Sequence, residues 1–165
     1  GRILEGPRVD EVSKYGRIYR VVSVGERNAK KEISLTQKDV RQVQLAKAAI
    51  RAGTEILLAR AGLRSSDIDT LFLAGAFGNY MRPESALSIG LLPPISSDKV
   101  IPVGNAAGAG AKRILLSSKE RERIESIAEK AHYIELAKAN GFNSLFTTCT
   151  RLIPEIADLE LEENR

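Results

Sequence analysis

The sequence predicts an α/β domain in which helices flank a mixed sheet. Two short runs rich in β-branched residues, 17–24 and 32–36, precede a long segment with helical periodicity. Beyond it, the apolar runs 70–74 and 99–103 alternate with helix-forming segments. Because a hairpin is antiparallel and strands separated by helices return in parallel, we expect one sheet that contains both kinds of pairing.

The first two strands are predicted as a hairpin. The runs "RIYRVVSV" and "EISLT" are joined by the polar loop "GERNAKK", which is the pattern of two antiparallel strands. Glycine and proline interrupt residues 1–16 too often for an assignment. We therefore treat 1–16 as a poorly defined lead-in from a longer parent chain.

A long helix is predicted over residues 37–62. Thr36 is placed as an N-cap with Asp39 at the third helical position, and Gly62 provides the stop. An apolar stripe is expected to lie on the sheet: Val43, Ala46, Ile50, Gly53, Leu57 and Ala61. The opposite, solvent-facing side is expected to carry Gln37, Arg41, Gln44, Arg51 and Glu55, with Lys47 at the boundary.

Two strand ends carry the residues that suggest a binding site. In "TLFLAGAFGNYM" the unbroken apolar run 71–74 reads as a central strand buried on both faces, and Gly75 and Gly78 follow it. In "VIPVGNAAGAGAKRILL" the run 100–103 breaks into Gly104 and Asn105. If the strands at 70–74 and 99–103 are adjacent and parallel, both loops meet at one sheet edge, where α/β proteins bind ligands. A tight strand-to-helix turn is the alternative, and neither loop is a Walker A or a dinucleotide fingerprint.

The remaining elements complete an alternating order. Pro83 is placed to open a short helix, and helices are expected at 106–117 and 118–131. The later segments suggest a strand at "HYIELA", a short helix or turn at "FNSLFTTC", and an acidic tail over 151–165. The order of strands and helices over 17–150 is that of a ribonuclease-H-like half-domain.

Composition excludes several classes of function. A content of 43% hydrophobic residues, with no run long enough for a membrane helix and no signal peptide, predicts a cytoplasmic protein without membrane contact. The net charge of +4 is small and acids alternate with bases, as in "KERERIESIAEK", so nucleic-acid binding is not expected. A single Cys149 and a single His132 give no metal site.

Three motifs in order carry a resemblance to a known family. "ISLTQKDVRQVQLAKAAIRAGTEILLARAG", "FLAGAFGNYMRPESALSIGLLP" and "VIPVGNAAGAGA" resemble the C-terminal ATPase domain of the ATP-dependent reductive activators of corrinoid proteins. The similarity extends over residues 17–115. That family is related to the acetate and sugar kinase, heat-shock chaperone and actin superfamily, whose nucleotide lies between two ribonuclease-H-like subdomains.

The resemblance implies an adenosine-binding role for the two glycine loops. The cofactor-binding residues it suggests are Gly75, Ala76, Phe77, Gly78, Asn79, Gly104, Asn105 and Gly108, with Gln44 and Lys47 from the long helix facing the base or ribose. It implies ATP and Mg²⁺ in the complete domain and a 2Fe-2S centre elsewhere in the parent. It names no catalytic residue here, since the phosphate and metal ligands are expected in the other subdomain.

The function implied is the nucleotide-binding half of an activator that reduces Co(II) corrinoid proteins to Co(I). Its expected partners are the corrinoid protein and the remainder of the parent chain, namely the first ATPase subdomain and a ferredoxin-like domain; a homodimer is left open. Whether this chain alone is catalytic is also left open. Two alternatives remain: a non-catalytic binding or dimerisation module, and a half-domain of a small-molecule kinase.

Overall fold

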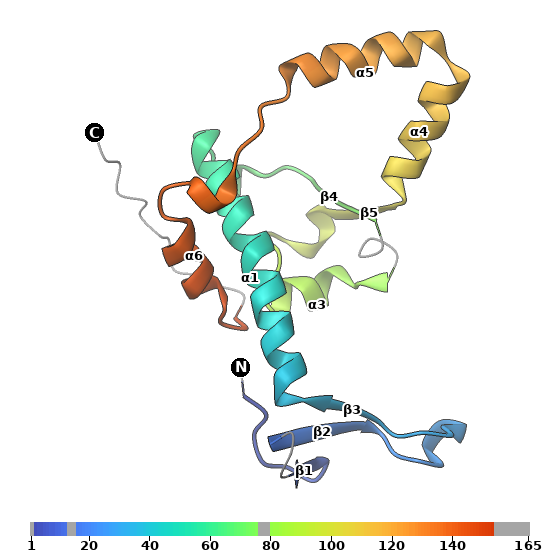
Figure 1. Cartoon of the computed structure of the whole chain (residues 1–165), viewed down its shortest axis with the longest axis vertical. Helices are drawn as coiled ribbons and strands as arrows, with labels where there is room; N and C mark the ends of the chain where they lie inside the picture. Colours follow the sequence, from blue (N-terminus) through green and yellow to red (C-terminus); the bar gives the residue numbers. More distant parts are fainter. Residues whose placement is uncertain (1, 13–15, 76–79, 154–165) are drawn as a thin grey trace.

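The computed structural model describes residues 2–12, 16–75 and 80–153. Figure 1 shows two small sheets joined by one long helix, with further helices around the second sheet. The expected α/β class is confirmed, but the strands of the described residues form an antiparallel and a parallel sheet instead of one mixed sheet. The helices are α1 Gln37–Arg60, α3 Pro83–Ser88, α4 Ala106–Leu116, α5 Ser118–Lys130 and α6 Phe142–Cys149. Short 3-10 turns lie at Ser65–Asp67, Ser97–Lys99 and Leu136–Lys138 (η4).

The antiparallel sheet has the order β1-β2-β3, with strands Val9–Val12, Gly16–Val22 and Ile33–Thr36. The predicted hairpin is β2–β3, in which Ile18 faces Thr36 across the ladder. The first strand was not predicted and lies inside the segment treated as a lead-in, where Val9 pairs with Tyr19. Two valines are enough for a strand there because β2 supplies the hydrogen-bonding edge.

Helix α1 begins and ends close to where the sequence predicts. Thr36 and Asp39 form the expected capping box, with the Asp39 carboxylate accepting from the Thr36 N–H at 2.8 Å. At the other end Gly62 has a positive φ of 68°, and the Leu63 N–H donates to the Leu58 carbonyl at 2.9 Å. These are the bonds of a Schellman motif, which closes the helix through a left-handed glycine.

The buried face of α1 is not the predicted one. Val43, Ile50 and Leu57 are exposed, whereas Lys47 and Arg51 are buried. The buried positions of the helix are Lys47, Ala48, Arg51, Ala52, Gly53 and Ile56. The helix packs its small residues against α6, where they form a core with Leu145 and Cys149, because alanine and glycine let two helices approach closely.

Residues 132–137, predicted as a strand, do not form one. The chain instead makes the 3-10 turn η4, and Leu136 packs against the α1–α6 core. Its Cδ1 lies 2.9 Å from the point where a Cβ would stand on Gly53. The leucine therefore occupies space that the glycine leaves on α1, and this contact outweighs the local preference for a strand.

The parallel sheet consists of β4, Leu71–Ala74, and β5, Val100–Gly104. One face packs on the residues around α3, including Ala86, Leu91 and Leu92. On the other face Phe72 is 65% exposed, so the prediction that this strand is buried on both faces is wrong. Its apolar run alternates in exposure because only one of its faces has a helix packed on it.

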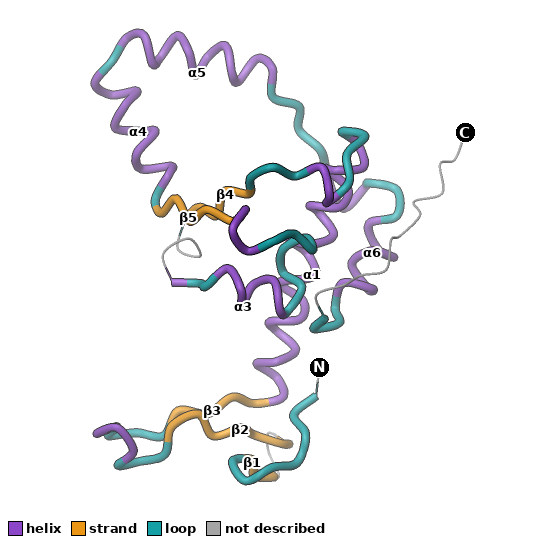
Figure 2. Tube along the Cα trace, turned by 180° about the vertical axis from the view of Figure 1, so that it is seen from behind, coloured by secondary structure: helices purple, strands orange, loops and turns teal. Residues whose placement is uncertain are grey.

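Helices α4 and α5 confirm the two segments predicted after the second glycine loop. Ser117 separates them and caps α5, with its hydroxyl accepting from the Glu120 N–H at 3.3 Å. Neither helix contains a buried residue. In Figures 1 and 2 the pair extends from the end of β5 as an arm before the chain returns to α6.

Candidate functional site

The ends of β4 and β5 lie next to each other, as predicted. The strands are parallel, with Leu71 beside Val100 and Phe72 beside Ile101. At their carboxyl ends the Gly75 N–H donates to the Gly104 carbonyl at 2.7 Å. The two glycine loops therefore leave the sheet at the same edge, and we refer to Gly75, Gly104, Asn105 and Gly108 as the glycine edge.

Both strand-ending glycines adopt a conformation that favours glycine. The φ angle is 77° at Gly75 and 60° at Gly104, in the left-handed region where a Cβ is unfavourable. Gly75 and Asn105 are exposed, and Gly104 and Gly108 are partly exposed. The backbone of the edge is therefore open to a ligand from solvent.

Asn105 organises the start of α4. It is the N-cap, and its Oδ1 accepts a hydrogen bond from the Gly108 N–H at 2.9 Å. A Cβ on Gly108 would stand 2.6 Å from the Asn105 Nδ2, so the glycine leaves room for the capping side chain. The N–H groups of Ala106 and Ala107 have no intrahelical acceptor, since none exists at that end of a helix. Together with the helix dipole they favour negative charge at this position.

Two predicted site residues lie elsewhere. The Gln44 Nε2 donates to the Thr150 carbonyl at 2.8 Å, and the Lys47 Nζ donates to the Gly90 carbonyl at 3.1 Å. These bonds join α1 to the end of α6 and to the turn after α3, and neither reaches the glycine edge. Residues 76–79, the other members of the predicted set, lie outside the described residues, so their role stays a prediction.

The second notable cluster is a pair of buried cations on α1. Lys47 and Arg51 are each 2% exposed. The Arg51 Nη1 donates to the Leu92 carbonyl at 2.5 Å, and its Nε forms an ion pair with the Glu55 Oε1 at 2.7 Å. Sequence reasoning placed Arg51 on the solvent side and missed this arrangement. The available signal was the small residues beside it, which allow close packing on that face.

Burial shifts the ionisation of this cluster. Removal from water lowers the pKa of Lys47. Cys149 opposes this shift, and the neighbouring Arg51 guanidinium adds a smaller lowering effect. Burial raises the pKa of the Cys149 thiol, although both cations oppose that shift. A buried thiol of raised pKa has little thiolate character and is a poor nucleophile.

An open hollow of about 370 Å³ at the end of α1 is lined by Ile56, Ala59, Arg60, Lys138, Ala139 and Asn140. Within the described part of the chain no group of three or more His, Cys, Asp or Glu side chains is placed to hold a metal ion. Nor does any helix of those residues have the length and apolar character to cross a membrane.

Comparisons with known proteins agree with the geometry. Residues 1–160 match the family described as the C-terminal domain of RACo, the ASKHA domain. A corrinoid activation enzyme, RamQ, of Eubacterium limosum is 45% identical over 129 residues, covering 78% of this chain and 21% of that protein. A [Co(II) methylated amine-specific corrinoid protein] reductase of Methanosarcina barkeri is 29% identical over 116 residues, with coverages of 69% and 21%.

A solved structure is also similar. The chain aligns with a reductive activator for corrinoid, iron-sulfur protein with a TM-score of 0.79 and 35% identity, covering 90% of this chain and 23% of that one. The expected ribonuclease-H-like fold is consistent with this neighbour and with the matched family. The chain spans only about a fifth of the length of the curated relatives it matches.

Proposed function

The chain belongs to the family of the C-terminal domain of RACo, the ASKHA domain, and from this premise we propose that it is the nucleotide-binding half of an ATP-dependent activator. The parent protein uses ATP to drive reduction of a Co(II) corrinoid protein to Co(I). The electrons come from a 2Fe-2S domain outside this chain. The partners are the corrinoid protein and the rest of the parent, and the location is the cytoplasm.

The observation that carries the proposal is the glycine edge. An adenosine and its phosphates need backbone groups within contact distance, and side chains on the approaching residues would block them. At this edge Gly75 and Gly104 remove two side chains at adjoining strand ends. The first turn of α4, built from alanine and glycine, adds unpaired N–H groups and the positive end of a helix dipole.

The residues present fit a nucleotide and do not fit the 2Fe-2S cluster of the parent. One buried cysteine cannot supply the four thiolates of a 2Fe-2S cluster. The ligands of Mg²⁺ are expected in the nucleotide phosphates and the other subdomain, since among the described residues no group of three or more His, Cys, Asp or Glu side chains is placed to hold a metal ion. We therefore assign no step of the reaction to either metal on this chain, and its own contribution is to bind and orient the nucleotide.

Coupling to electron transfer is proposed to be conformational. A nucleotide shifts an equilibrium between open and closed forms only by the difference in its affinity for them. A shift from 1:99 to 99:1 needs about 5.5 kcal/mol of such a difference. The difference in affinity would arise from contacts between the glycine edge and the other subdomain that exist only in the closed form.

Substitution of Asn105 by aspartate in the full-length parent tests the proposal. Aspartate is as good an N-cap as asparagine, so α4 should keep its capping bond to the Gly108 N–H. The added negative charge would repel the phosphates of a nucleotide at the same position. We expect unchanged or higher thermal stability together with an affinity for MgATP that is about tenfold weaker, equivalent to about 1.4 kcal/mol.

The matched control is Asn140→Asp, the same chemical change at an exposed position on the hollow at the end of α1. It should leave the affinity for MgATP unchanged. Isothermal titration calorimetry gives the affinities, and circular dichroism confirms that each variant is folded. A folded Asn105→Asp variant that binds MgATP with wild-type affinity would show that the nucleotide does not bind at the glycine edge.

A further inference from the structure

The loop between β2 and β3 is a protruding and ordered turn. Figure 1 places it at the end of the antiparallel sheet opposite to α1, and the view from behind in Figure 2 shows the same separation. The Ala29 N–H donates to the Glu26 carbonyl at 3.0 Å, and the Gly25 N–H donates to the Ala29 carbonyl at 3.0 Å. We refer to residues 25–31 as the hairpin tip.

The two central residues of this turn both have a left-handed backbone. The φ angle is 53° at Arg27 and 61° at Asn28. This pair of angles is that of a type I′ turn, in which asparagine and glycine are favoured. Asn28 fits that preference, but Arg27 does not, since its Cβ is unfavourable at positive φ. A residue held in an unfavourable conformation at an exposed position suggests that its side chain has a role there.

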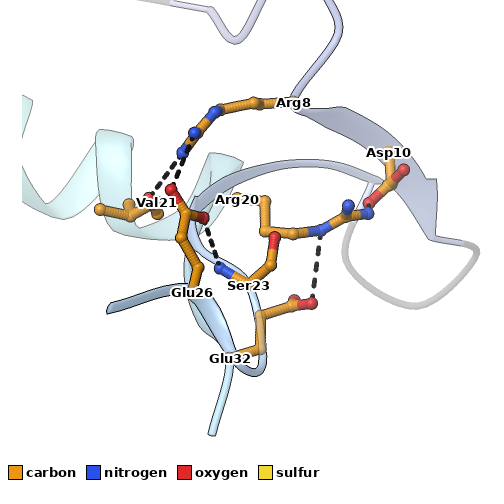
Figure 3. Close-up of polar contacts among 7 residues, drawn as sticks. All are labelled: Arg8, Asp10, Arg20, Val21, Ser23, Glu26 and Glu32. Atoms are coloured by element: carbon orange, nitrogen blue, oxygen red, sulfur yellow. Dashed lines mark hydrogen bonds and ion pairs between the residues drawn. The ribbon is translucent and has the colours of Figure 1, made fainter. Parts of the chain in front are cut away.

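Side chains around the turn fix its shape. Figure 3 shows Arg8, which donates to the Val21 carbonyl at 2.9 Å and pairs with Glu26 at 3.0 Å. Glu26 in turn accepts from the Ser23 N–H at 3.1 Å. Hydrogen bonds from Ser23 and then Arg8 hold the pKa of Glu26 below its ordinary value, so this carboxylate stays charged and bonded. Within β2 itself, Arg20 pairs with Asp10 of β1 and with Glu32.

Lys30 and Lys31 of the hairpin tip take no part in this network, and Arg27 acts on it only through the attraction of its charge to Glu26. Arg27, Lys30 and Lys31 are exposed, and in the described residues none of them forms a salt bridge. Val24, at 68% exposure, and Ile33, at 57%, lie on either side of the tip. An apolar spot with a charged rim is the usual composition of a protein–protein contact.

We propose that the hairpin tip is a docking element for an acidic surface of the corrinoid protein on which the parent acts. The assignment rests on the proposed function, and it adds where and through which chemistry the partner is recognised. Complementary charge at such a rim speeds association and fixes orientation. A turn that is already ordered loses little conformational entropy when it binds.

Other anionic partners fit this surface less well. Two β-branched side chains are too small an apolar area to insert stably into a bilayer. Binding of nucleic acid favours aromatic stacking or an uninterrupted basic stripe, whereas Glu26 and Glu32 lie among these cations and the tip has no aromatic residue. A structured acidic protein surface accommodates both the cations and the small apolar spot.

The first test is charge reversal, K30E together with K31E, in the full-length parent. Stopped-flow association with the corrinoid protein should become about tenfold slower at low ionic strength, and the difference should shrink in high salt. The matched control is K38E with K119E, which reverses two exposed lysines in the first turns of α1 and α5, where glutamate is well tolerated. Its association rate should stay within about twofold of wild type.

The second test separates recognition from structure at Arg27. Arg27→Asn suits the left-handed backbone and removes the cation, so it should raise the melting temperature and slow association. Arg27→Lys keeps the charge and should associate at close to the wild-type rate. Opposite changes in stability and association in the asparagine variant are not expected if Arg27 has only a structural role.

The outcomes distinguish this proposal from the proposed function. Wild-type protein that does not bind the corrinoid protein would overturn both. Normal wild-type binding with an unaffected K30E/K31E variant would overturn the docking assignment alone. The docking assignment would also be overturned if charge reversal weakened binding only to vesicles of phosphatidylcholine and phosphatidylserine, or only to single-stranded RNA.

Discussion

The backbone N–H of Gly75 donates to the carbonyl of Gly104 at 2.7 Å, so two loops far apart in the sequence meet at one edge of the parallel sheet. Each of these glycines has a positive φ and each ends a strand. Asn105 follows directly and caps α4. The proposed nucleotide site therefore depends on backbone geometry more than on reactive side chains, and its tests are substitutions of small residues.

Gly75→Ala should destabilise the domain through its backbone alone. No atom of the described residues lies within 4 Å of the added Cβ, so the cost is that of a left-handed alanine, about 1–2 kcal/mol. The control is Gly110→Ala, which also meets no atom within 4 Å but lies inside α4. It should stabilise by about 0.5–1 kcal/mol. Urea unfolding measures both, and a harmless Gly75→Ala would contradict the backbone assigned to this junction.

Gly108→Ala should not give the stabilisation that alanine normally brings to a helix. The new Cβ would stand 2.6 Å from the Asn105 Nδ2 and force the capping side chain to move. Loss of an N-cap costs about 1 kcal/mol, which offsets the gain in helix propensity. We expect Gly108→Ala to be less stable than Gly110→Ala in the same urea series. Equal stability of the two variants would show that the Asn105 cap contributes little.

The buried Lys47 should make stability depend on alkaline pH. Its pKa in the folded protein is below the ordinary value of 10.5, so the unfolded chain binds the additional proton between the two values. Stability from this residue is therefore lowest below the folded pKa, rises with pH across that interval and levels off above 10.5. The measurement is the difference in unfolding free energy between wild type and Lys47→Met as a function of pH.

In that comparison the contribution of Cys149 has the opposite sign. Its raised pKa makes the folded state of each protein lose stability as pH rises above 9.0, and because Lys47 opposes this shift the contribution of the thiol does not cancel fully between the two proteins. A difference between wild type and Lys47→Met that is flat from neutral to alkaline pH would mean that the Lys47 ammonium is hydrated in solution.

The chain by itself should bind MgATP far more weakly than the complete ATPase domain and should show no hydrolysis above background. Losing two or three charge-assisted hydrogen bonds from the other subdomain, at roughly 1.5–3 kcal/mol each, weakens binding by several orders of magnitude. Calorimetry on both proteins gives the comparison. Equal affinities would mean that the glycine edge is a complete site.

The sequence by itself determined the elements that depend on local chemistry. The Thr36–Asp39 capping box and Gly62 set the ends of α1, because caps are made by neighbouring residues. The hairpin β2–β3 followed from β-branched runs around a polar loop. The parallel pairing of β4 and β5 followed from the handedness of strand–helix–strand crossovers. The same pattern placed the two glycine loops at one sheet edge, and the family resemblance added the nucleotide, which remains a prediction.

Only the tertiary structure decided which surfaces are buried. Periodicity placed Arg51 on the solvent side of α1. In the structure α6 and the turn after α3 pack on that side, and the Leu92 carbonyl and Glu55 bind the Arg51 guanidinium. Residues 132–137 do not form the predicted strand, because Leu136 packs in the space that the missing side chain of Gly53 leaves on α1. Phe72 is exposed because no helix covers its side of β4 in the described residues. Burial depends on which elements meet, and that is settled by contacts distant in sequence, which local patterns do not contain.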